Sequence, residues 1–311
     1  MQKLVEVRKR AATVRSIRSV ASTMATVASA KLSRTRERAA GMRVYAERMR
    51  EVIRRQQAAA AELGVDLVGL SPFLQPRAEL RRVLLLHVSG DRGMCGAYNS
   101  AIDRIAGAFI RERRAEGVEV AAIAKGLKGA KFLHRRTEAT LLDSAGWPKA
   151  GVTMDQLDAL SARLSAAFMS GEVDEVWCTY TRFYSPMRRY PTLVRLLPLT
   201  FESAAGTGAA SSGTEARRWF YEPDLATVVT ELMGIFLRLQ VEDVLLESYA
   251  SEQGARMITM EEATERADRS LQELTVAYNR LRRELITSDL IGVLFASSLR
   301  EDERSLDGGE A

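Results

Sequence analysis

The sequence predicts an α/β protein in which two long terminal helices form an antiparallel two-helix coiled coil around an inserted α/β domain. Apolar residues recur in alternating steps of three and four from Leu4 to Ile53 and again from Met257 to Leu285. This spacing averages about 3.5 residues per turn, the period of a left-handed coiled coil, so each segment requires a helical partner. Between them, short apolar runs alternate with amphipathic stretches, which is typical of a sheet covered by helices.

Residues 1–62 are predicted to form the first coiled-coil helix. They contain one glycine, Gly41, and no proline, so local helix propensity agrees with the apolar period. Within the seam only Arg18 and Thr35 are polar. The helix is expected to end at Gly64, before an irregular connector that contains two prolines.

Residues 78–215 are predicted to form the inserted α/β domain. The run VLLLHV at 83–88 is typical of a strand that is buried on both faces. Further strands are expected at 118–124, 175–183 and 191–199, and helices at 99–114 and 153–170. The small, polar segment 204–216 is expected to form a disordered loop.

The loop at 89–99, SGDRGMCGAYN, is glycine-rich and joins a predicted strand to a predicted helix, which suggests a phosphate-binding turn. It contains no GK[ST], however, and GxGxxG does not fit its spacing. Glycines that permit a tight turn and close helix packing are the favoured interpretation.

No catalytic constellation is predicted. His87 lies inside an apolar strand, which is typical of a core histidine, and His134 lies among arginines. Cys95 and Cys178 have neither CxxC nor zinc-ligand spacing and are expected to be reduced packing residues. We therefore predict no catalytic residue, no cofactor and no metal site.

Residues 220–300 are predicted to form the second coiled-coil helix, followed by a disordered tail at 301–311. The two helices are expected to pair with each other, because a parallel arrangement would require the middle domain to bridge roughly 75 Å. Beyond Leu285 the seam loses its register and apolar residues lie all round the helix, which indicates an enclosed tip. The residues assigned to this tip are Leu290, Ile291, Leu294 and Phe295.

Charge is concentrated on the first helix. Residues 1–55 contain fifteen Lys and Arg against four Asp and Glu, a net charge of +11, so the overall +5 leaves −6 for the rest. Such a helix suits nucleic acid, an anionic membrane or an acidic protein, and is also compatible with the solvated face of a coiled coil. Tyr45 is the one aromatic residue among these basic residues, which argues against single-strand stacking. The amino terminus lacks a secretory apolar stretch, so a cytoplasmic location is expected.

Several motifs, in order along the chain, carry a family resemblance. The amino-terminal pattern is Arg8, Arg10, Met24, Val27, Ala28, Lys31 and Leu32. It is followed by VSGDRGMCGAYN, by Trp219, Tyr221, Glu222, Pro223 and Asp224, and by SEQGARMITMEEAT, AYNRLRRELIT and Asp289. On these motifs the chain resembles, essentially end to end, the gamma subunit of the F-type ATP synthase.

The resemblance implies a central rotor shaft with an inserted Rossmann-like α/β domain. Such a shaft couples ion flow through a membrane ring to ATP synthesis or hydrolysis on the beta subunits. It implies a subunit that is not itself catalytic, that is not a homo-oligomer, and that lies peripherally at the cytoplasmic face of the cell membrane. The implied partners are the alpha and beta subunits, the epsilon subunit and the membrane c-ring, with no nucleic acid.

The resemblance also implies contact residues. Those assigned to the beta subunits are Met24, Lys31, Arg282, Thr287 and Asp289, and those assigned to the membrane ring and the epsilon subunit are Tyr221 and Glu222. Met24 falls outside the three-four series, so ordinary seam packing is not expected for it.

The chain departs from the family pattern in places. Ser16, Arg18, Ser19 and Ser22 replace the usual lysine and glutamine cluster, and Arg283 replaces a glutamine. These changes would suit a somewhat divergent sodium- or proton-pumping rotary ATPase. Two alternatives of another class are a coiled-coil scaffold, which leaves the apolar tip unexplained, and a basic nucleic-acid-binding protein, which requires steeply salt-dependent DNA affinity.

Overall fold

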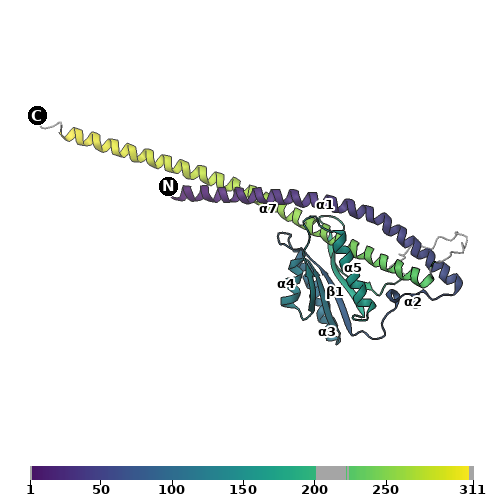
Figure 1. The fold of residues 1–311 in the computed structure, drawn as a ribbon. Helices are drawn as coiled ribbons and strands as arrows, with labels where there is room; N and C mark the ends of the chain where they lie inside the picture. The colour runs from purple at the N-terminus through teal and green to yellow at the C-terminus, as the bar shows by residue number, and fades with distance from the viewer. Residues whose placement is uncertain (1, 201–221, 223, 308–311) are drawn as a thin grey trace. The chain divides into compact units, whose positions relative to one another are not determined.

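The computed structural model describes residues 2–200, 222 and 224–307. Two long helices, α1 and α7, flank a mixed α/β region in the sequence (Figure 1). The elements, in order, are α1 (Gln2–Leu63), α2 (Leu67–Leu70), the 3₁₀ helix η1 (Pro72–Leu74), β1 (Arg82–Val88), α3 (Tyr98–Ala115), β2 (Glu119–Lys125), α4 (Leu127–Arg136), β3 (Thr140–Ala145), α5 (Met154–Met169), β4 (Glu175–Phe183), β5 (Arg189–Leu197) and α7 (Leu225–Asp307).

The sheet has five strands in the order β3-β2-β1-β4-β5. The pairs β1–β2, β1–β4 and β2–β3 are parallel, and β4–β5 is antiparallel. Chain order therefore reverses at β1, which has β2 on one side and β4 on the other. This doubly wound arrangement confirms the predicted α/β class.

Both faces of the sheet are buried, because successive side chains of β1 pack alternately into the hydrophobic cores on its two sides. Val83 and Leu85 pack with α3 and α4, whereas Leu84 and Leu86 pack with α5 and α7. Six of its seven residues are buried, as expected for a parallel strand covered by helices on both sides.

By their internal contacts the residues form two compact units, one made of 1–25 with 260–311 and one made of 26–259. In the first unit, Arg18 forms an ion pair with Asp268, while Ala21 and Ala25 pack against Met260. In the second, Arg38 pairs with Glu242. In the first unit, rising numbers on α1 meet falling numbers on α7, so the helices run antiparallel, as the sequence predicts.

Predicted strands 83–88, 118–124, 175–183 and 191–199 correspond to β1, β2, β4 and β5, and the two predicted helices correspond to α3 and α5. The segment that forms α4 and β3 was not assigned from the sequence. Five of the six β3 residues are exposed, so this edge strand lacks the apolar run that reveals a buried one.

Two boundaries differ from the prediction. The second long helix begins at Leu225 rather than 220, because the Asp224 carboxylate accepts hydrogen bonds from the Thr227 backbone N–H (2.9 Å) and hydroxyl (2.8 Å), which caps the helix. The helix is described to Asp307, beyond the predicted boundary at 300, and residues 308–311 of the expected tail lie outside the described residues. The predicted loop 204–216 lies outside the described residues.

Candidate functional site

The coiled-coil seam in the unit of 1–25 and 260–311 is narrow. Ala21, Ala25 and Met260 form its buried core, with Met24 and Ala263 packed against them. Alanine lets the helices approach closely but buries little apolar area per residue. Arg18 interrupts the apolar series, and its ion pair with Asp268 explains why a cation is tolerated there.

Two predicted contact residues lie on α1. Met24 is half-buried against the Ala21–Met260 cluster, so the expectation that it does not pack in the seam is wrong, because its long, flexible thioether reaches round from a flanking position. Lys31 is half-buried, and its charge acts on Glu252, whose pKa it helps to lower.

The predicted contact residues on α7 lie near its carboxyl end. Arg282, Thr287 and Asp289 are exposed, and the Thr287 hydroxyl donates to the Arg283 carbonyl at 2.9 Å. Leu290 and Ile291 of the predicted tip are 59% and 48% exposed. Such exposure of large apolar side chains side by side is unusual for a helix surface that faces water.

The remaining predicted site residues give less information. Glu222 is exposed. The side chains of Leu294 and Phe295, and the whole of Tyr221, lie outside the described residues.

The loop after β1 approaches α7 very closely. In open α/β sheets, ligands bind at the carboxyl edge where strand order reverses, which is here the end of β1. A Cβ on Gly90 would lie 2.9 Å from Glu252 Oε1, and Tyr98 Oη lies 2.8 Å from Ser248 Oγ. The loop glycine therefore serves close helix packing, as predicted, and α7 occupies the edge at which a nucleotide would bind.

The titratable groups at this edge are buried and held by partners. Burial raises the pKa of Glu252 despite its 2.6 Å ion pair with Arg256. Burial also raises the pKa of the Cys95 thiol and of the Tyr98 hydroxyl. Each of these groups is driven toward its neutral form in a water-poor environment, which suits packing rather than proton transfer with a bound substrate.

Lys125, at the end of β2, is a buried charge that sequence reasoning missed. Its Nζ donates to the Gly146 carbonyl at 2.9 Å and to the Gln156 side chain, and lies 4.9 Å from the centre of the Trp147 ring. Burial lowers its pKa to about 8, with Asp91 acting in the opposite direction. The buried charge could have been expected from the sequence, because this lysine ends an apolar strand.

A second missed group joins α1, α7 and the segment before α5. Arg38 pairs with Glu242, which is 4% exposed, and Arg38 Nη1 donates to the Val152 carbonyl at 2.5 Å. Glu242 lies on the apolar face of α7, and an acidic residue at an apolar position of this helix is the sequence signal that could have revealed the ion pair. This ion pair fixes three elements of the α/β unit together.

His87 is a satisfied core histidine, as predicted. Its ring nitrogens lie 2.8 Å from Thr179 Oγ1 and 3.0 Å from Asp103 Oδ1. Across the described residues, no cluster of three His, Cys, Asp or Glu side chains is arranged to hold a metal ion.

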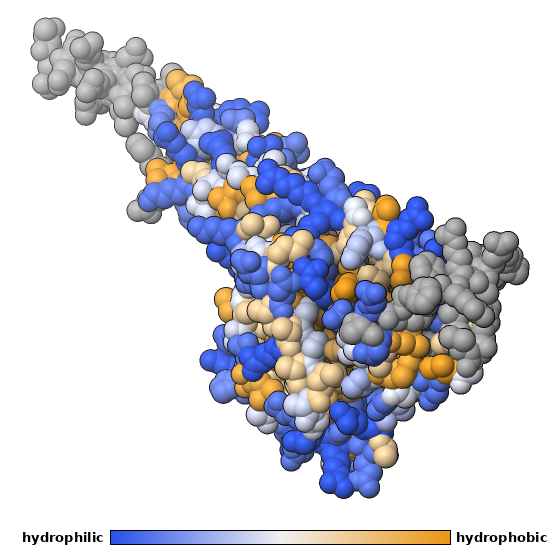
Figure 2. Space-filling model, turned by 45° about the vertical axis from the view of Figure 1, so that its right-hand side comes forward, coloured by the Kyte–Doolittle hydropathy of each residue, from blue (hydrophilic) through white to orange (hydrophobic). Residues whose placement is uncertain are grey.

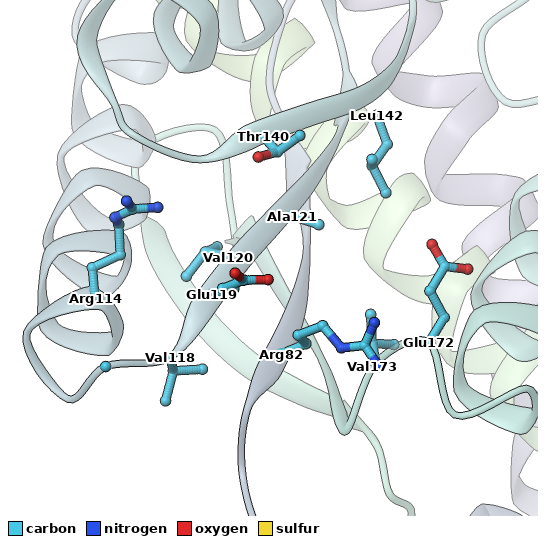
Figure 3. A pocket seen from close by; sticks show the side chains of 11 residues that line it. Arg82, Arg114, Val118, Glu119, Val120, Ala121, Thr140, Leu142, Glu172 and Val173 are labelled. Atoms are coloured by element: carbon cyan, nitrogen blue, oxygen red, sulfur yellow. The ribbon is translucent and has the colours of Figure 1, made fainter.

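A hollow of about 440 Å³ lies at the amino ends of the strands (Figure 3). Arg82, Arg114 and Glu119 are among the residues that line it, but Arg114 pairs with Glu138 at 2.9 Å and Arg82 donates to the Gly171 carbonyl at 3.1 Å. This is the end of the sheet opposite to the one at which α/β proteins bind ligands. The hollow therefore lacks the features of an active site.

One face of the molecule can be followed in a space-filling view. On the face seen in Figure 2, hydrophilic residues dominate and apolar residues lie between them. In the part of the chain that is described, no helix combines the length and the hydropathy needed to span a bilayer.

The family model described as ATP synthase matches residues 3–297. The chain is 35% identical over 297 residues to the ATP synthase gamma chain of Dehalococcoides mccartyi strain CBDB1, which covers 94% of this chain and 98% of the relative. The chain belongs to the ATP synthase gamma chain family. A gamma chain from Geobacter metallireducens is 33% identical, over 94% of this chain and 97% of its own length.

Solved structures agree with the gamma chain fold. One chain of the Tetrahymena thermophila mitochondrial ATP synthase central stalk and c-ring matches with a TM-score of 0.56 and 22% identity, over 78% of this chain and 99% of its own length. One from the Euglena gracilis mitochondrial ATP synthase matches with a TM-score of 0.63 and 15% identity, over 97% and 96%. At these identities the likeness concerns the fold alone.

Proposed function

We propose that this gamma chain is the central rotor stalk of an F-type ATP synthase, coupling ion flow through a membrane ring to ATP synthesis or hydrolysis on the beta subunits. The observation that carries the proposal is the end-to-end similarity to gamma chains. The antiparallel pairing of α1 with α7 in the unit of 1–25 and 260–311, and the ion pair of Arg38 with Glu242 in the other unit, support it.

The chain contributes mechanics rather than chemistry in this proposal. The coiled coil has two unlike helices, so it presents a different face to each catalytic subunit as it turns. Each subunit has conformations that differ by a small free energy, and a differential contact with the shaft shifts their populations in turn. The filled carboxyl edge of the sheet supports a subunit with no catalytic site of its own.

The partner contacts follow the two ends of the chain. Met24, Lys31, Arg282, Thr287 and Asp289 contact the beta subunits, and the tip at Leu290, Ile291, Leu294 and Phe295 is enclosed by the ring of alpha and beta subunits. Tyr221 and Glu222 contact the c-ring and the epsilon subunit. The chain is then peripheral to the cytoplasmic face of the cell membrane through the complex.

The test is co-expression with the cognate alpha and beta subunits. We expect purification of an ATPase-active complex that holds one copy of this chain per three beta subunits, measured by native mass spectrometry. Recovery of the chain only as a free homodimer, beside an alpha–beta assembly that lacks it, would overturn the proposal.

A further inference from the structure

The turn between β4 and β5 presents exposed side chains that the proposed function does not use. Met187 is 74% exposed, Tyr184 is 59% exposed and Tyr190 is 49% exposed. We call residues 184–190 the hairpin tip. Tyrosine, methionine and arginine are enriched at protein interfaces, whereas isolated apolar surface residues are usually spread out.

The hairpin tip is pre-organised. The Arg188 carbonyl accepts from the backbone N–H groups of Tyr184 and Ser185, both at 3.1 Å, and the Arg188 N–H donates to the Ser185 carbonyl at 3.1 Å. The rings of Tyr184 and Tyr190 meet edge-on, 5.6 Å apart. A partner that binds this turn therefore has little conformational entropy to remove.

The base of the hairpin is fixed to α7. Gly254 has no side chain, and a Cβ there would lie 3.4 Å from both Phe183 and Pro186. The Ser251 hydroxyl donates to the Thr181 carbonyl at 3.0 Å. The tip is thus held on a helix of the α/β unit.

The charge of the hairpin indicates the kind of partner. Residues 176–200 contain four arginines and no aspartate or glutamate. Arg182 lies beside the Tyr180 hydroxyl and Glu247, and Arg195 pairs with Glu175, whereas Arg188 of the tip is exposed. Its side chain is available for a carboxylate from outside the chain.

We propose that the hairpin tip docks onto an acidic surface of another protein subunit in the same complex, with Met187 at the centre of the contact and Arg188 facing a carboxylate. This inference rests on the proposed function for its setting. Central apolar anchors with a charged rim are the usual arrangement of an interface hot spot.

The test places the photo-crosslinker benzoylphenylalanine at position 187 in the complex assembled with the cognate subunits. We expect one dominant crosslinked subunit, with the crosslinked peptide carrying Asp or Glu near the site of attachment. Arg188→Glu should lower the crosslink yield about tenfold, and Arg188→Lys should restore most of it, because the lysine keeps the charge. The matched control places the crosslinker at Leu142, which is 41% exposed on β3, and should not label the same subunit.

Three outcomes would overturn the inference: no subunit crosslink at position 187, a crosslink to a segment without carboxylates, and a yield unaffected by Arg188→Glu. Melting curves of the free chain check that the Arg188 variants are folded. If the chain fails to assemble with the other subunits at all, the proposed function fails. If it assembles and position 187 stays unlabelled, only the docking inference fails.

Discussion

At the residue scale, Lys125 contributes a pH-dependent term to the stability of the α/β unit. Its acceptors are a backbone carbonyl and an amide, so no carboxylate bonds it directly. Its pKa of about 8 in the folded chain lies below the ordinary value of 10.5. At this side chain the unfolded chain therefore binds more protons between these two values, so the contribution of Lys125 to stability rises with pH across that window.

We predict that Lys125→Met changes this dependence. The pKa difference corresponds to about 3 kcal/mol. The penalty of the buried charge is complete below pH 8 and disappears as pH approaches 10.5. The variant should therefore lose its advantage in free energy of unfolding, relative to the parent chain, as pH rises from 7 to about 10.

Urea unfolding at several pH values measures this difference. Lys128→Met, at an exposed lysine on α4, serves as the control for the removal of one lysine side chain. A Lys125→Met difference that stays constant from pH 7 to 10 would contradict the assignment.

Prediction of individual residues from the sequence succeeded where a local sequence pattern determines the environment of the residue. His87 in an apolar strand is a core residue, and the loop glycine Gly90 serves packing. It failed for Met24, Lys125 and Glu242, whose environments are set by elements distant in the sequence. A contact across more than two hundred residues, such as Arg38 with Glu242, leaves no local signature.

At the element scale, the carboxyl-terminal part of α7 carries large apolar side chains that are exposed to solvent in this chain. The seam is at least half-buried from Met257 to Leu285, and every residue from Ile286 to Gly292 is exposed. The three-four spacing stops at the same place. The spacing therefore located both the paired segment and the point at which α7 no longer has α1 beside it.

We predict that Leu290→Asp, and separately Ile291→Asp, will weaken assembly with alpha and beta subunits. A charge placed in an enclosed apolar contact carries a desolvation cost of several kcal/mol, which corresponds to a loss of affinity of at least tenfold. Pull-down yield and the ATPase activity of the recovered complex measure the effect.

Leu127→Asp provides the control, because Leu127 is 55% exposed at the first position of α4, where an acidic residue suits the helix dipole. Equal assembly of all three variants would show that the end of α7 is not enclosed.

The spacing was least informative for the elements that lack a buried face. Strand β3 and helix α4 were not assigned, because five of six β3 residues are exposed and α4 is short and basic. The spacing also leaves the end of α7 open. The polar sequence after 300 suggested disorder, whereas α7 extends to Asp307, because residues of good helix propensity can continue a long helix.

At the scale of the whole molecule, the α/β core is built from both ends of the sequence. The core cluster on one face of the sheet contains ten residues of α7 between Val229 and Tyr249, together with Met49, Ile53 and Ala60 of α1. Without α7, one face of the sheet would expose that apolar surface to water.

We predict that a fragment ending at Thr200 does not fold cooperatively, whereas residues 26–259, which form one compact unit, do. The first fragment lacks α7 and should bind the dye ANS and unfold without a sharp transition, because secondary structure without fixed packing has these properties. Thermal melts followed by near-UV circular dichroism distinguish the two. A cooperative melt of the shorter fragment would refute the prediction.

The position of Ser248 and Glu252 at the carboxyl edge of the sheet has a consequence for synthesis of the chain. A ribosome makes all five strands before it makes the helix that seals their edge. Until about residue 259 has left the exit tunnel, the nascent domain exposes an apolar face of its sheet, because the α7 residues that pack against this face are not yet available. Incomplete domains of this kind are prone to aggregate. Maturation of the α/β domain is thereby timed to the completion of the shaft.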